Sequence, residues 1–188
     1  MLFRSSSRSS NRSSNGSPKQ VVLGLFNPKT PENVGGIMRA AGCYRVDAVM
    51  YTGKRYLRAA QYSTDTKNVH LEIPLTVVQC LIDSAPAGSK MVCVELVEGA
   101  IPLPQFQHPS NAFYVFGPED GSLSQDVIDH ADAVVYIPTV GCMNLAATVN
   151  VLLYDRLAKC SQTIANDDLV RESRDTNNRV KVKRLKVN

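Results

Sequence analysis

The sequence predicts an α/β fold, built on a mostly parallel β-sheet with helices on both faces. Two observations lead to this prediction. Short apolar runs alternate with helical segments along the chain, and cap or turn residues separate them. The chain has 188 residues, of which 44% are hydrophobic, so it can bury one sizeable core and we expect a single main domain.

The first part of the chain predicts a strand at 21–26, a helix at 34–42 and a strand at 48–51. Asn27-Pro28 ends the first strand, and Thr52-Gly53 ends the second. The tetrapeptide Thr30-Pro31-Glu32-Asn33 supplies residues that are typical of a helix start. Residues 54–74 show no clear period, so no element is predicted there.

The second part predicts, in order, a helix at 75–83, strands at 91–97 and 113–116, a helix at 123–130, a strand at 133–137 and a helix at 145–161. The turn residues Ala85-Pro86-Ala87-Gly88 close the first of these helices. The last helix has one apolar face, made of Leu145, Val149, Leu152, Leu153 and Leu157. Strands that alternate with helices in this way are typical of parallel sheets.

The charge is concentrated at the two ends of the chain. Residues 1–20 carry four basic residues and no acid, and residues 171–188 carry seven basic residues against two acids. We expect a disordered Ser/Arg-rich arm at 1–18, a folded domain at 20–162 and a basic tail at 163–188. Basic ends can attract a polyanion such as RNA, or they can simply be solvated, and the composition fits both interpretations equally.

Cysteine and histidine usage argues against disulfides and metals. The five cysteines form no C-x-x-C pair, and the three histidines show no ligand spacing, so we expect reduced thiols and no metal site. No apolar run reaches the roughly 20 residues of a membrane span. These features predict a soluble, cytoplasmic protein, with organellar targeting by the N-terminus as a minority alternative.

Three common nucleotide or hydrolase motifs are absent. The first strand is followed by Asn27-Pro28-Lys29-Thr30, not by the G-x-G-x-x-G of dinucleotide folds. The phosphate-loop signature and the G-x-S-x-G nucleophile elbow are also missing. The sequence therefore argues against hydride transfer, nucleotide hydrolysis and ester hydrolysis.

Three other segments each follow a predicted strand: Asn33–Arg39, Phe116–Ser124 and Ile137–Leu145. In an open parallel sheet, ligands bind at the carboxyl ends of the strands, so these segments should meet at one site. Each also has a purely structural interpretation. Gly35-Gly36 allows close packing, Gly117-Pro118 makes an ordinary turn, and Asn144 is a good helix cap.

The first segment, Asn33-Val34-Gly35-Gly36-Ile37-Met38-Arg39, resembles the first motif of the SpoU/TrmH branch of the SPOUT, or α/β-knot, methyltransferases. Residues 116–124 resemble the second motif, and Ile137-Pro138 with residues 143–145 through 154–156 resembles the third. The resemblance covers roughly residues 20–160. It implies a C-terminal trefoil knot, a homodimer, and methyl transfer from S-adenosylmethionine, usually to a ribose 2′-hydroxyl of tRNA or rRNA.

The resemblance also implies roles for individual residues. Arg39 occupies the place of the catalytic arginine, Asn33 would hold the loop before it, and Glu119 would orient Arg39 or the substrate. Asn144 would brace the knot loop. The methyl donor would be bound by Glu95, Leu96, Gly117, Ile137, Cys142, Met143 and Leu145. Because a guanidinium is effectively always protonated, we expect Arg39 to stabilise a developing alkoxide or to hold a phosphate, not to act as a base.

Two further functions remain open at this stage. Many family members place serine before and after the third-motif asparagine, whereas this chain has Cys142 and Ala146, and its loop before Asn144 is shorter than in several relatives. A catalytically inactive RNA-binding protein with the same fold is therefore one alternative. Methylation of an RNA base is the other, because the same scaffold also supports that reaction.

Overall fold

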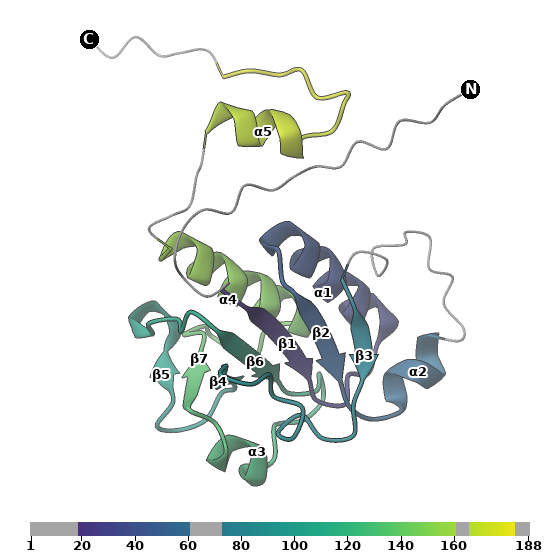
Figure 1. Ribbon diagram of the computed structural model, residues 1–188, viewed down its shortest axis with the longest axis vertical. Coiled ribbons are helices and arrows are strands. Elements are labelled where there is room, and N and C mark those ends of the chain that lie inside the picture. The colour runs from purple at the N-terminus through teal and green to yellow at the C-terminus, as the bar shows by residue number, and fades with distance from the viewer. Residues whose placement is uncertain (1–18, 61–72, 161–165, 183–188) are drawn as a thin grey trace.

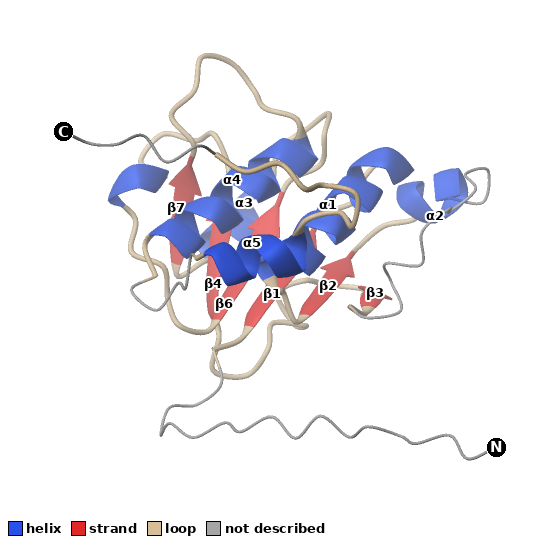
Figure 2. Ribbon diagram, turned by 90° about the horizontal axis from the view of Figure 1, so that it is seen from above, coloured by secondary structure: helices blue, strands red, loops and turns tan. Residues whose placement is uncertain are grey.

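The computed structural model describes residues 19–60, 73–160 and 166–182. Seven strands form one sheet in the order β3-β2-β1-β6-β4-β7-β5, and every neighbouring pair is parallel. Figure 2 shows that the labelled strands lie side by side. The strands are β1 (Val21–Leu25), β2 (Ala48–Tyr51), β3 (Leu75–Val77), β4 (Lys90–Val94), β5 (Ile101–Pro102), β6 (Ala112–Phe116) and β7 (Ala133–Tyr136).

Helices cover both faces of this sheet, as predicted. On one face, α1 (Pro31–Tyr44) and α4 (Leu145–Ala158) lie side by side, and α3 (Gln125–Asp129) lies on the other (Figure 1). The core is divided in the same way: one cluster joins α1 and α4 to the sheet, and the other joins α3 and the turns after β3. Because both faces are covered, every residue of the central strand β6 is buried.

The predicted helix at 75–83 is wrong. Residues 75–77 form the edge strand β3, and turns follow it. β2 pairs with β1 on one side only, so its backbone groups on the other side are free to pair with residues 75–77. Val49 N donates to Pro74 O, and Val78 N donates to Tyr51 O, both at distances under 3 Å. A helical pattern of apolar residues is a weak preference, and the pairing with β2 overrides it. Thr76 and Val77 are β-branched and suit a strand.

The remaining differences are in the length and number of elements. Helix α1 begins earlier and ends later than predicted, and its C-cap Arg45 has the left-handed backbone conformation. The strand predicted at 91–97 ends at Val94. Four short elements were missed: α2 (Arg55–Ala60), β5, the 3-10 turn η2 (Leu103–Gln105) and α5 (Asp167–Ser173).

Helix α4 carries the predicted apolar face with one exception. Leu145, Val149, Leu152 and Leu153 are buried, whereas Leu157 is exposed. The helix begins at Asn144, whose side chain accepts hydrogen bonds from Ala146 N and Ala147 N. A buried network holds its C-terminal part. His108 lies 2.6 Å from the Tyr114 hydroxyl and 2.9 Å from Asp155, and desolvation by burial lowers the pKa of His108.

The two predicted basic ends are only partly described. The arm at 1–18 lies outside the described residues. The predicted tail contains α5, in which Asn166 caps the helix by accepting a hydrogen bond from Leu169 N and no residue is buried. The division into arm, domain and tail therefore stays a prediction. Among the described residues, no helix is both long and apolar enough to cross a membrane.

Replacing Gly24 by alanine should destabilise the fold. A Cβ at this position in β1 would lie 2.8 Å from Cζ of Phe113, a ring with no exposed surface. We expect the free energy of unfolding, measured by urea titration, to fall by about 1–3 kcal/mol. Gly42→Ala is the matched control, because Gly42 lies exposed in α1 with no atom within 4 Å of the added carbon. Its helix should gain up to about 1 kcal/mol, and an equal loss in both variants would contradict this account.

Candidate functional site

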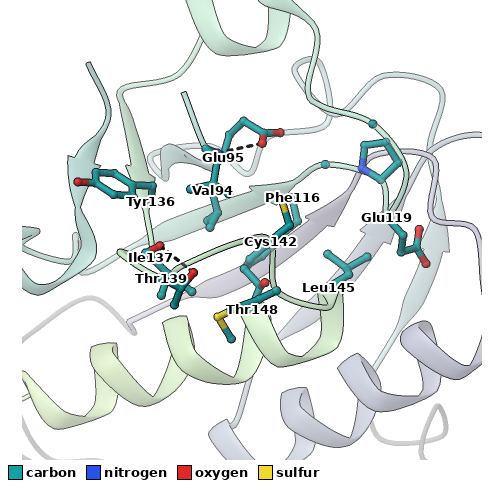
Figure 3. A pocket seen from close by; sticks show the side chains of 15 residues that line it. Val94, Glu95, Phe116, Glu119, Tyr136, Ile137, Thr139, Cys142, Leu145 and Thr148 are labelled. Carbon is teal, nitrogen blue, oxygen red and sulfur yellow. Dashed lines mark hydrogen bonds between the residues drawn. The ribbon is translucent and has the colours of Figure 1, made fainter. Parts of the chain in front are cut away.

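A pocket opens at the carboxyl ends of β4, β6 and β7 (Figure 3). Its empty space, the open mouth included, is about 700 Å³. The structure brings together here all seven residues predicted for the methyl donor, namely Glu95, Leu96, Gly117, Ile137, Cys142, Met143 and Leu145. Eight further positions line the pocket: Val94, Phe116, Pro118, Glu119, Gly121, Tyr136, Thr139 and Thr148. Five of them lie in the segments 116–124 and 137–145 that were predicted to meet at the site, whereas Val94, Tyr136 and Thr148 were not assigned to it.

The carboxylate of Glu95 is fixed against the pocket wall. It accepts hydrogen bonds from the backbone N–H groups of Leu96 and Leu123, both at 2.9 Å. A Cβ on Gly117 would lie 2.9 Å from Oε2 of this carboxylate. Gly117 is therefore required here for close approach and not only for a turn. The absence of a side chain at Gly117 keeps this side of the pocket open.

The opposite wall is the loop between β7 and α4. The Thr139 hydroxyl donates to Gly141 O at 3.0 Å, and Gly141 has a φ of 93°, which favours glycine. Cys142 and Met143 follow at the pocket wall, and Leu145 and Thr148 continue it from the first turn of α4 (Figure 3). Ala146, the other departure from the serine pattern, does not line the pocket. It faces α1, where a Cβ on Gly36 would lie 3.0 Å from its own Cβ.

A chain of polar side chains joins the three motifs beside the pocket. Asn144 Nδ2 donates to Asn33 Oδ1, and Asn33 Nδ2 donates to Glu119 Oε1, both at 2.8 Å. Glu119 also accepts from the backbone N–H groups of Lys29 and Thr30, at 2.8 and 3.1 Å. Burial raises the pKa of Glu119, but the bonds from Asn33 and the backbone outweigh it, so the net pKa is lowered. The carboxylate is therefore ionised at neutral pH.

The structure does not bring Arg39 into this chain of contacts. Arg39 is exposed on α1 and does not line the pocket. Within the described part of the chain, it makes no hydrogen bond or ion pair, either to Glu119 or to Glu32. It follows Asn33 by six residues, which is about 9 Å along a helix. Glu119 thus orients Asn33 and the β1–α1 loop, and the prediction that it orients Arg39 is not supported by a contact.

Asp120, directly after Glu119, holds two cations at the edge of the pocket. Lys29 Nζ lies 3.1 Å from its Oδ2, and Arg55 Nη2 lies 2.9 Å from both of its carboxylate oxygens. The hydrogen bonds from Arg55 and then Lys29 lower the pKa of Asp120. Sequence reasoning missed this cluster, since its members are 65 and 91 residues from Asp120. The described residues contain no group of three side chains that could hold a metal ion.

Comparisons with known proteins agree with the motifs. Residues 20–154 match the SpoU rRNA Methylase family. A comparison with curated proteins found no match. Three solved structures that share the fold are an rRNA methyltransferase from Sinorhizobium meliloti, the SpoU methyltransferase AviRb from Streptomyces viridochromogenes in complex with AdoMet, and a protein described in a study of 2-OH methylation of C/U34 on tRNA.

Their sequence identities to this chain are 20%, 19% and 20%, and their TM-scores are 0.64, 0.63 and 0.65. The matches cover 74%, 75% and 77% of this chain and 56%, 58% and 93% of the three relatives. The chain thus spans little more than half the length of the first two. The match to the family covers most of the chain, and the predicted resemblance is confirmed: the chain belongs to the SpoU rRNA Methylase family.

Proposed function

We propose that this protein is an S-adenosylmethionine-dependent RNA methyltransferase that acts on a ribose 2′-hydroxyl of tRNA or rRNA. The main support is that residues of the second and third motifs line one pocket, and that Asn33 of the first motif is hydrogen-bonded to Glu119 and Asn144 beside it. Two of the similar structures belong to methyltransferases, one of them with AdoMet bound, and a third comes from a study of 2-OH methylation on tRNA. We infer the same chemistry for this chain.

The residues of the pocket fit S-adenosylmethionine. The apolar side chains of Leu96, Ile137 and Leu145 suit an adenine ring, and the open side at Gly117 leaves room beside the Glu95 carboxylate. When bound, this cofactor supplies a methyl group on a cationic sulfur, which is already a good electrophile. The task of the protein is then to align the ribose oxygen with that methyl group and to stabilise the charge that develops on the oxygen.

We assign the stabilising charge to Arg39. Its guanidinium stays protonated, and no described residue neutralises it, so it can donate hydrogen bonds to the developing alkoxide or to a neighbouring phosphate. Asn33, Glu119 and Asn144 act as positioning residues. They fix the start of α1, the helix that carries Arg39, to the start of α4, whose first turn lines the pocket.

We also propose that the protein works as a homodimer. The exposed side of α4 carries Val151, Tyr154 and Leu157, and Val140 in the adjoining loop is fully exposed. Exposed apolar side chains along one helix suit an interface with a second copy of the chain. The trefoil knot, RNA contact by the basic ends and the cytoplasmic location stay predictions.

Gly117→Ala should weaken binding of S-adenosylmethionine. The new Cβ would lie 2.9 Å from the Glu95 carboxylate, which two backbone hydrogen bonds hold in place. We expect an increase in Kd of about tenfold or more by isothermal titration, equivalent to about 1.4 kcal/mol. Gly121→Ala is the matched control in the same pocket, since its nearest neighbour, Pro118 Cγ, would lie 3.4 Å away. Absence of binding by the unaltered protein would favour the inactive RNA-binding alternative.

Arg39→Ala should lower methyl transfer to RNA by about 10²–10³-fold and leave the Kd for S-adenosylmethionine within about twofold. The assay uses total RNA and a labelled methyl donor, and nuclease digestion of the product separates ribose from base methylation. Arg45→Ala serves as control, because Arg45 is exposed at the far end of the same helix. If the turnover of Arg39→Ala is unchanged, Arg39 has no role in the reaction.

Glu119→Gln should destabilise the protein in a pH-dependent manner. Because the folded pKa of Glu119 is lowered, its ionised form stabilises the fold above the ordinary pKa of about 4.3, and this stabilisation is lost as the pH falls through the folded value. We expect unfolding free energies at pH 7 to differ by about 1–3 kcal/mol. The difference between the two proteins should shrink toward pH 3. A difference that is constant from pH 7 to pH 3 would contradict the role of the ionised carboxylate.

A further inference from the structure

Four basic residues, three of them consecutive or one helical turn apart, lie beside the Asp120 turn at the edge of the pocket. Lys54 and Arg58 are four residues apart, and the hydrogen bond from Arg58 N to Lys54 O, at 3.1 Å, closes the helical turn between them. Arg55 lies in the same turn and points to Asp120. We call Lys29, Lys54, Arg55 and Arg58 the basic strip. Figure 1 shows α2 beside the carboxyl ends of β2 and β3. Because all neighbouring strands are parallel, this is the edge of the sheet at which the pocket also lies.

The charges of the strip are not balanced. Asp120 carries one negative charge and binds two cations, Lys29 and Arg55. Lys54 and Arg58 are exposed, and neither makes an ion pair with any residue that the structure describes. Glu119, the acid next to Asp120, is engaged by Asn33 and by backbone N–H groups. The strip therefore presents a surplus of positive charge next to the opening of the pocket.

Asp120 positions Lys29 and Arg55 through ion pairs that can exchange. Lys29 and Asp120 have side chains that are 53% and 46% exposed, and surface ion pairs of this kind contribute little to stability. A phosphate can replace the carboxylate as the acceptor for Lys29 and Arg55. Arginine in particular forms strong, directional hydrogen bonds to phosphate oxygens. The strip has the chemistry of a site for the backbone of a nucleic acid.

We propose that the basic strip binds the phosphodiester backbone of the substrate RNA next to the nucleotide that enters the pocket. The proposal rests on the proposed function, because it takes the occupant of the strip to be the RNA whose ribose is methylated. Each cation would neutralise one phosphate and would position the strand without reading its sequence. The strip then fixes which part of the RNA reaches the methyl donor, and α2 is a substrate-binding element.

The test compares single variants that each remove one charge, Lys54→Gln and Arg58→Gln, with the control Arg45→Gln. Arg45 is also exposed but lies at the C-cap of α1, 14 residues beyond the Pro31 end of that helix. The probe is a fluorescent 20-nucleotide oligouridylate, titrated by anisotropy at several salt concentrations. Loss of one phosphate contact should raise the Kd about fivefold at 0.1 M salt and reduce the slope of log K against log salt by about 0.7. Arg45→Gln should change neither quantity.

Two measurements separate a lost charge from a damaged helix. Lys54→Arg and Arg58→Lys keep the charge and should restore the Kd and the slope, and S-adenosylmethionine should bind all these variants equally.

The possible outcomes distinguish the two proposals. If the unaltered protein binds the donor and methylates RNA while Lys54→Gln and Arg58→Gln match Arg45→Gln, RNA binding by the basic strip is wrong and the proposed function stands. If the unaltered protein neither binds the donor nor methylates RNA, the proposed function fails, and the salt slopes still decide whether the strip binds RNA. If the unaltered protein does not bind the oligouridylate, the proposal that the basic strip binds RNA is wrong.

Discussion

The carboxylate of Glu119 accepts four hydrogen bonds from the segment that connects β1 to α1 and from the first turn of α1, and the geometry of the site depends on them. Two come from the backbone of Lys29 and Thr30, one from the Thr30 hydroxyl and one from Asn33. Glu119 itself follows β6, the neighbour of β1 in the sheet. The interaction thus ties together the ends of two adjacent strands, and through Asn33 and Asn144 it reaches the start of α4. Even partial burial of an ionised carboxylate is costly unless the carboxylate is hydrogen-bonded in this way, so burial and bonding have to occur together.

The close approach of α1 and α4 is the second condition for this arrangement. Asn33 and Asn144 can meet only if the first turns of the two helices lie nearly in contact. At that point α1 has Gly36 and α4 has Ala146, and a Cβ on the glycine would already be 3.0 Å from the alanine. Small residues on both helices therefore permit the bond between the two asparagines. Ala146 therefore packs against α1 and does not line the pocket. Of the two departures from the serine pattern, only Cys142 stands where a ligand could touch it.

The sequence predicted those parts of the fold that depend on local patterns. The strands β1, β2, β6 and β7 are apolar runs in the sequence, and each motif follows the end of such a run, so their meeting at one edge could be foreseen. Residues 75–77 could not be assigned correctly, because they form a strand only through pairing with the edge of β2. The two-residue strand β5 is too short for any pattern. The contact of Asp120 with Lys29 and Arg55 was also unforeseeable, since segments with no shared motif meet only after folding.

Glu119 and Asp120 are consecutive carboxylates with opposite relations to solvent, and this difference explains how one short turn can serve two purposes. The side chain of Glu119 points to the β1–α1 segment, where its bonds are to fixed backbone groups, so it cannot exchange partners without disrupting the loop. The side chain of Asp120 points to the surface, where its partners are the flexible ends of Lys29 and Arg55. Water screens these pairs, and an incoming anion can compete for the same cations at little cost in free energy. The turn after β6 can therefore be rigid toward the pocket and exchangeable toward the solvent. The proposed function requires this of a site that binds a small donor on one side and a large polyanion on the other.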